Sequence, residues 1–179
     1  DFAELIEYLG MQPVDVVGQS DGGIIALLLG IHHPGTIDKM AIMGANLNPG
    51  PEAVNSWAPE WVRGKLAKVG DLIESGDTRE VLKIARKRLR LLLDHPNISP
   101  DDLSQIESPV LVMAGDRDII REEHTVDIYQ NLKNAHLCIF PGRTHFMLFT
   151  DPELFNSTIE RFMVNPFSMP SSQEIMSRW

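Results

Sequence analysis

A serine flanked by glycines is the first candidate for chemistry in this sequence. Residues 18–22 read Gly-Gln-Ser-Asp-Gly, which matches the pattern G-x-S-x-G, and they lie between two apolar segments. This context predicts a sharp turn from a strand into a helix, where small neighbours let the hydroxyl of Ser20 project from the backbone. A phosphate-binding loop is the alternative, but the segment lacks a Lys-Ser/Thr ending and Asp21 would repel phosphate. We therefore predict that Ser20 is a nucleophile rather than a turn residue.

A serine nucleophile needs a base, and the base needs a third group that holds it in the right tautomer. Asp116 and Asp118 follow an apolar run at 109–114, and His145 follows the next apolar run, in the segment PGRTHF. If these runs are parallel strands, their carboxyl ends meet at one edge of the sheet. We therefore expect His145 and one of the two acids to lie close to Ser20.

The remaining histidines and the single cysteine lack partners for chemistry. We assign His95, His124 and His136 to the surfaces of an insertion, a helix and a strand, and the apolar run AHLCIF predicts a buried Cys138. No spacing of His and Cys is typical of a metal site. The predicted chemistry therefore requires no cofactor and no metal ion.

Strand-like and helix-like segments alternate along the chain. Apolar β-branched runs are typical of buried strands, and apolar residues at spacings of three and four are typical of helices. The expected strands are 14–18, 39–47, 109–114 and 135–142, and the expected helices include 2–9, 24–33, 121–133 and 151–163. Such alternation predicts the α/β class, with a mostly parallel sheet, helices on both faces and right-handed crossovers.

The segment from about 48 to 100 changes character. It contains Pro49, Pro51 and Pro59, two of the three tryptophans and helical patterns near 60–75 and 78–93, so we interpret it as a helical insertion. Trp57 and Trp61 either form the core of this insertion or line an apolar substrate pocket. We expect one domain at 1–163, interrupted by the insertion, and a loosely attached tail at 164–179.

Composition limits the classes of partner. The chain of 179 residues has a net charge of -9, which disfavours nucleic acid and anionic lipid, and no apolar run is long enough to span a membrane. A small-molecule substrate remains the expected partner. Six cations are clustered in the sequence of this acidic chain, and we interpret them as a solvated helix face or as an electrostatic patch near a substrate entrance. They are Arg79, Lys83, Arg86, Lys87, Arg88 and Arg90.

Three segments resemble the nucleophile, acid and histidine segments of the α/β-hydrolase superfamily: VVGQSDGGIIALLLGIHHPGTIDKMAIMGANL, PVLVMAGDRDII and IFPGRTHF. The resemblance covers about residues 1–163, and the first segment is particularly similar to the serine esterases of the valacyclovir hydrolase group. It implies a serine hydrolase of ester or amide-like acyl bonds, with the insertion as a helical lid. It also implies that Asp118, rather than Asp116, orients His145.

The same resemblance implies two roles for Asp21. Its backbone N–H follows the nucleophile and would donate to the oxyanion that forms during acyl transfer. In the valacyclovir hydrolase group the acid after the nucleophile is associated with the α-amino group of the substrate, which implies aminoacyl esters as substrates here. A carbon-carbon bond hydrolase or lyase of the same fold, or a non-catalytic fragment or scaffold, remains an alternative.

A complete fold of this superfamily has about eight strands, with the nucleophile after the fifth. We therefore expect this chain to correspond to the C-terminal half, without the N-terminal strands and the loop that gives the second oxyanion donor. Its first strand would then have an unpaired edge. The missing N-terminal half, or a second copy in a homodimer, would cover that edge.

Overall fold

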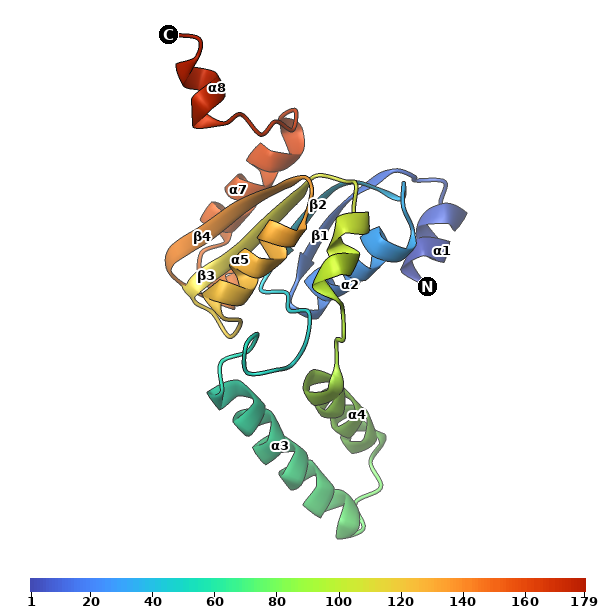
Figure 1. Cartoon of the computed structure of the whole chain (residues 1–179). Helices are drawn as coiled ribbons and strands as arrows, with labels where there is room; N and C mark the ends of the chain where they lie inside the picture. Colours follow the sequence, from blue (N-terminus) through green and yellow to red (C-terminus); the bar gives the residue numbers. More distant parts are fainter.

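Four parallel strands form the centre of the molecule. The computed structural model describes all 179 residues, and its sheet has the order β1-β2-β3-β4 (Figure 1). The strands are β1 (Val14–Gln19), β2 (Ile37–Met43), β3 (Val110–Arg117) and β4 (Ala135–Thr144). All three neighbouring pairs are parallel, which confirms the predicted α/β class.

Helices lie before the first strand, in the connections between the strands and after the last strand. None combines the length and the apolar character needed to span a membrane. They are α1 (Phe2–Tyr8), α2 (Asp21–His32), α3 (Trp57–Glu74), α4 (Glu80–Asp94), the 3₁₀ helix η1 (Pro100–Gln105), α5 (Glu122–Asn131), α6 (Met147–Thr150), α7 (Pro152–Val164) and α8 (Ser172–Met176).

Alternating side chains of the inner strands supply two separate cores. On one face, Met40 and Ile42 of β2 pack with α2, η1 and α5 in a cluster of 17 buried residues. On the other face, Ala41 and Met43 pack with α6 and α7 in a cluster of eight. Because successive residues of a strand point to opposite faces, a run of apolar residues such as MAIM is what a strand buried on both faces requires.

The first strand departs from the prediction that both of its faces are covered. Val17 of β1 is 52% exposed, although its neighbour in β2, Ala41, is fully buried. The cluster under α6 and α7 draws its strand residues from β2, β3 and β4 and has none from β1. The edge strand therefore has one covered face and one open face.

The last two strands are longer than predicted. β3 continues past Gly115 to Arg117, and β4 runs through Pro141 and Gly142 to Thr144, with Arg117 paired to Thr144. Proline is tolerated in β4 because that strand lies at the edge of the sheet. Asp151 is the N-cap of α7, since its carboxylate accepts a hydrogen bond from the backbone N–H of Leu154.

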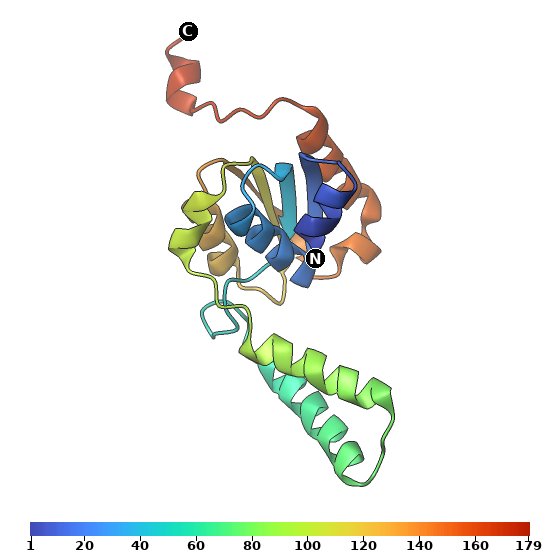
Figure 2. The same cartoon turned by 90° about the vertical axis from the view of Figure 1, so that its right-hand side faces the viewer.

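The insertion forms a hairpin of the two long helices α3 and α4, as the periodicity predicts. Figures 1 and 2 show this hairpin projecting from the sheet on the side opposite to α8 and the C-terminus. Its two connections to the sheet meet at one point, where the backbone N–H of Ile98 donates to the carbonyl of Leu47 over 2.8 Å. In the tail, α8 has no buried residue.

Candidate active site

The turn between β1 and α2 holds Ser20 in a conformation that few residues adopt. Ser20 has φ 56° and ψ -121°, and no other non-glycine residue of the chain has a positive φ. Its N–H donates to the carbonyl of Met43, and its own carbonyl accepts from Gly23 and Ile24 at the start of α2. Backbone strain of this kind persists only where the surroundings enforce it, and it is typical of functional sites.

The glycines around Ser20 do not all serve the turn in the same way. A Cβ on Gly18 would lie 2.3 Å from the carbonyl oxygen of Gly22, so only glycine fits at position 18. A Cβ on Gly23 would lie 3.0 Å from the Cβ of Ala45, which is closer than an ordinary contact. A Cβ on Gly22 would meet nothing within 4 Å. The expectation that both flanking positions must be small for steric reasons is therefore wrong for Gly22.

Ser20, His145 and Asp118 form a continuous chain of hydrogen-bonding groups. Oγ of Ser20 lies 2.9 Å from Nε2 of His145, and Nδ1 of His145 lies 2.6 Å from Oδ1 of Asp118. The imidazole is 6% exposed and so is Asp118, whereas Ser20 is only half-buried. The serine hydroxyl thus faces an accessible space, while the groups behind it are shielded from water.

Backbone groups and one amide fix this chain of side chains. The carboxylate of Asp118 also accepts hydrogen bonds from the N–H groups of Ile120, over 3.1 Å, and of Gly115, over 3.4 Å. The side-chain amide of Gln19 donates to the carbonyl of His145 over 2.9 Å. Gln19 was not singled out from the sequence, and its position beside the nucleophile is the signal that could have identified it.

A cavity of about 420 Å³ opens beside the serine hydroxyl. It lies between the ends of the strands and the base of the α3–α4 hairpin, and ten of its 17 lining residues are hydrophobic. Ser20 and His145 lie at one part of the wall, and Trp57, Trp61 and Phe146 supply aromatic surface. An apolar cavity with a few converging polar groups is typical of sites for small organic ligands.

Comparison with known proteins finds relatives that are hydrolases by name. The chain is 27% identical over 173 residues to human serine hydrolase BPHL, which covers 91% of this chain and 59% of that protein. It is 24% identical to a putative carbamate hydrolase RutD from Caulobacter, with 91% and 70% covered. It is also 24% identical to a 2-hydroxymuconate semialdehyde hydrolase from Pseudomonas putida, with 93% and 68% covered. The chain thus spans about three fifths of the length of BPHL.

No family model matches the sequence, but its fold matches solved structures. The α/β-hydrolase MGS-M2 from a deep-sea metagenome superposes with a TM-score of 0.76 at 19% identity, over 96% of this chain and 72% of that one. The chain therefore has the α/β-hydrolase fold. The resemblance seen in three sequence segments is therefore confirmed as a likeness in fold that extends over most of the chain.

Asp21 occupies the first position of α2. The first N–H groups of a helix have no partner within the helix, so the N–H of Asp21 is free to donate beside Oγ of Ser20. The Asp21 side chain is exposed and lines the cavity next to Ser20. It also lines a second cavity of about 470 Å³ between α2 and the end of α4.

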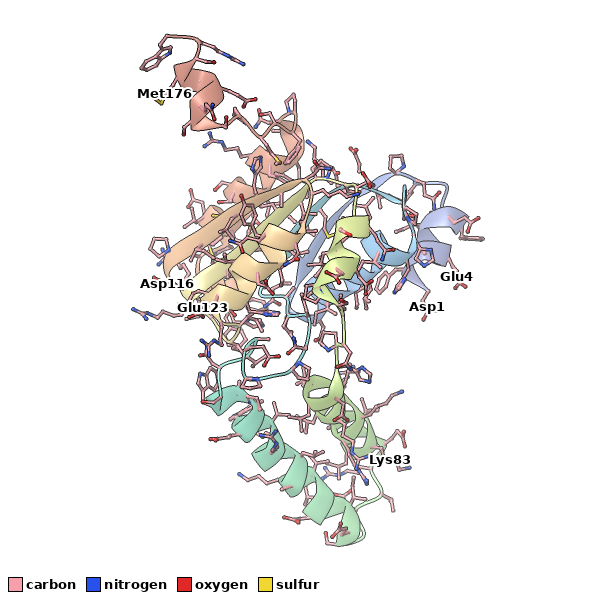
Figure 3. All side chains as sticks on the ribbon, viewed as in Figure 1. Asp1, Glu4, Lys83, Asp116, Glu123 and Met176 are labelled. Carbon is pink, nitrogen blue, oxygen red and sulfur yellow. The ribbon has the colours of Figure 1, made fainter.

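Asp116 is separate from the hydrogen-bonded groups around Ser20. It follows the apolar run but still lies within β3, and its carboxylate accepts a hydrogen bond from the N–H of Gly142 over 2.7 Å. Figure 3 labels it at the outer part of the sheet. This hydrogen bond joins β3 to β4, so Asp116 caps no turn.

Two of the three histidines assigned to surfaces lie elsewhere. His124 is buried in α5, where Nε2 accepts a hydrogen bond from the N–H of Leu47 over 3.0 Å, and burial lowers its pKa. His136 is half-buried against the rings of Phe162 and Phe167. His95 is exposed at the end of α4, as expected, but it lines the cavity beside Ser20.

The two hairpin tryptophans do not form the core of the insertion. Trp57 and Trp61 are 56% and 57% exposed, and both line the cavity. The buried residues of α3 are Ala58 and Val62 instead. The interpretation of the tryptophans as insertion core is therefore wrong, and the alternative, a pocket lining, matches their positions. Cys138, expected to be buried, is half-buried, and burial raises the pKa of its thiol.

Proposed function

We propose that this protein is a serine hydrolase that cleaves ester or amide-like acyl bonds. The observation that carries the proposal is the chain of groups from Ser20 through His145 to Asp118, with separations of 2.9 and 2.6 Å. The relatives named as a serine hydrolase and a carbamate hydrolase support the reaction class. No metal or cofactor enters the proposed reaction.

The proposed mechanism assigns one role to each group. Oγ of Ser20 attacks the carbonyl carbon while Nε2 of His145 takes its proton, and Asp118 stabilises the imidazolium through Nδ1–H. The N–H of Asp21 donates to the oxygen that becomes negative in the tetrahedral intermediate. The imidazolium then protonates the leaving group. Water, deprotonated by His145, attacks the acyl-enzyme and releases the acid.

Burial of the two supporting side chains suits this division of roles. The carboxylate of Asp118 is hydrogen-bonded to the imidazole and to two backbone N–H groups, so it stays in place as His145 gains and loses a proton. In a site shielded from water, the attraction between the carboxylate and the imidazolium is less screened than in solution. Trp57 and Trp61 are proposed to bind the apolar part of the substrate.

The decisive experiment measures covalent labelling of the serine. The protein is incubated with a fluorophosphonate and its intact mass is determined, because such reagents phosphonylate a serine that a nearby base activates. We expect one adduct on the wild type, none on Ser20→Ala, and normal labelling of Ser104→Ala, which removes an exposed hydroxyl on η1. An unlabelled wild type, or a labelled Ser20→Ala variant, would contradict the proposed nucleophile.

We further propose that the carboxylate of Asp21 selects substrates with a cationic amino group. It is the acidic group among the residues that line the cavity, and it is adjacent to the nucleophile. An amino acid ester is therefore expected to be hydrolysed with a higher kcat/KM than its N-acylated analogue, and Asp21→Asn should remove the difference. Equal kcat/KM for the two esters in the wild type would refute this selectivity and leave the hydrolase proposal standing.

A carbon-carbon bond hydrolase is the second candidate, because a relative 24% identical to this chain is named 2-hydroxymuconate semialdehyde hydrolase. The same three side chains could serve that reaction. Hydrolysis of a substrate of that type by the wild type, with no turnover of simple esters, would favour the second candidate over the first. A non-catalytic scaffold is expected to do neither and to remain unlabelled.

A further inference from the structure

The cations of this acidic chain are concentrated on one helix. Residues 79–90 hold six Lys and Arg and a single acid, Glu80, whereas the whole chain has a net charge of -9. Arg79 is bound to Asp77 over 2.7 Å, and Lys83 contacts Glu80 over 3.1 Å. The other four cations of this segment make no ion pair, so the helix carries uncompensated positive charge.

Four of these cations share one face of α4. Lys83, Arg86, Lys87 and Arg90 follow the i, i+3, i+4, i+7 spacing of a helix face, and these four residues alone line a shallow hollow of about 270 Å³. Like charges four residues apart destabilise a helix, and here Lys83 faces Lys87 and Arg86 faces Arg90. An anionic partner would remove that repulsion.

Apolar side chains are exposed directly beside the cationic face. Ile84 and Leu91 are 46% and 50% exposed, and Lys87 and Arg88 lie between them at spacings of three and four residues. Val81, one turn earlier, is also exposed. A helix with this combination of a cationic face and an exposed aliphatic stripe is typical of surfaces that bind at the boundary of a lipid bilayer.

The position of α4 leaves these residues accessible. Figures 1 and 2 show the α3–α4 hairpin standing clear of the sheet, and Figure 3 labels Lys83 on α4 in the part of the hairpin remote from the sheet. The two acids nearest to these cations in sequence, Asp77 and Glu80, are already paired with Arg79 and Lys83.

We propose that α4 docks the protein on an anionic lipid surface, with Lys83, Arg86, Lys87 and Arg90 toward the head groups and Ile84 inserted between them. Nucleic acid would satisfy the cations but would leave Ile84 and Val81 without an apolar environment, which is why the lipid surface is the partner that fits both features. The net charge of the whole chain disfavours anionic lipid as a partner, but the local positive charge of α4 favours it at this one surface.

The test is cosedimentation of the full chain with vesicles of phosphatidylcholine alone and of phosphatidylcholine with about one third phosphatidylserine. We expect binding only to the vesicles with phosphatidylserine, and loss of binding as the salt is raised from roughly 0.05 to 0.5 M. Each cation near an anionic surface strengthens binding by about fivefold, so Lys87→Ala with Arg90→Ala should weaken it about 25-fold.

Matched variants separate docking from total charge and hydrophobicity. Arg161→Ala with Arg178→Ala removes the same charge at exposed sites outside the hairpin, and it should bind like the wild type. Ile84→Gln should weaken binding, whereas Val164→Gln, at an exposed site at the end of α7, should not. Circular dichroism of each variant establishes that its helices are intact.

Three results would overturn the proposal. They are equal binding to both kinds of vesicle, no binding to either, and an effect of the Arg161 and Arg178 pair as large as that of the α4 pair. Binding to RNA or DNA without binding to the charged vesicles would assign the surface to nucleic acid instead. None of these results bears on the labelling of Ser20, so the two proposals stand or fall separately.

Discussion

Replacing Gly44 by alanine should disable the site through a single methyl group. Gly44 follows β2 with φ 60°, and a Cβ built on it would lie 2.7 Å from both Cε1 and Nδ1 of His145. An ordinary contact begins at 3.4 Å, so the imidazole must retreat by about 0.7 Å. His145 is bonded on both sides, to Ser20 over 2.9 Å and to Asp118 over 2.6 Å, so any retreat lengthens at least one bond.

The expected loss of activity follows from that displacement. A misplacement of a catalytic group by roughly 1 Å costs on the order of 100-fold in rate, so Gly44→Ala should lower the rate of fluorophosphonate labelling and kcat/KM for an activated ester by about that factor. Alanine at a positive φ also costs the fold about 1–2 kcal/mol. The labelling rate is measured by intact mass at several times, and stability by urea unfolding.

A second glycine supplies the control. Gly35 also has a positive φ, 82°, but a Cβ on it would meet nothing within 4 Å. Gly35→Ala should therefore lose a similar amount of stability and keep the wild-type labelling rate. Wild-type rates for folded Gly44→Ala, or an equal loss of rate in Gly35→Ala, would refute the argument that the methyl group acts through His145.

Three further perturbations test other parts of the structure. Asp118→Asn should lower kcat by roughly 10⁴-fold with little change in stability, because the amide favours the wrong tautomer of the imidazole, and a loss below tenfold in ester hydrolysis would contradict that role. Leu27→Ala should cost about 2–5 kcal/mol in urea unfolding because Leu27 is fully buried, whereas Ile25→Ala, at an exposed site on the same helix, should cost less than half as much. Burial lowers the pKa of His124 below 6.5, although the negative charges of Asp127 and Glu52 act to raise it. As the pH falls, the unfolded chain is therefore protonated at His124 before the folded chain is. The contribution of neutral His124 to the free energy of unfolding is therefore complete above about pH 6.5 and declines as the pH falls toward the lowered pKa. The variant His124→Gln can still accept a hydrogen bond from the N–H of Leu47 but does not titrate. It should therefore remove this part of the pH dependence of unfolding.

The alternation of strands and helices was predictable because it depends on local patterns. Runs such as AIM in β2 and LVM in β3 are buried on both faces, and that burial requires apolar residues at every position. The approach of Ser20, Asp118 and His145 was predictable for a related reason. Each follows or ends a parallel strand, and the carboxyl ends of parallel strands meet at one edge whatever the loops between them do.

Features that depend on contacts between distant segments were not predictable. His124 was assigned to a helix surface, but its partner is the N–H of Leu47, 77 residues earlier in the chain. The spacing of residues around His124 does not predict that contact. The open face of β1 was missed because Val17 has the same apolar character as the buried residues of β2, and only the position of α7 over the other strands distinguishes them.

The hydrogen bond between Ile98 and Leu47 has a consequence for how the protein can vary. Because the chain leaves and re-enters the sheet at this one point, the 50 residues between them form a cassette with adjacent ends. Closing a loop costs little more when the loop is lengthened, so α3 and α4 can be shortened, extended or exchanged, provided that residues 53–55 keep their hydrogen bonds to residues 118–121. Chimeras that keep residues 48–55 and replace α3 and α4 by foreign helical hairpins should therefore keep the sheet and change which molecules reach it.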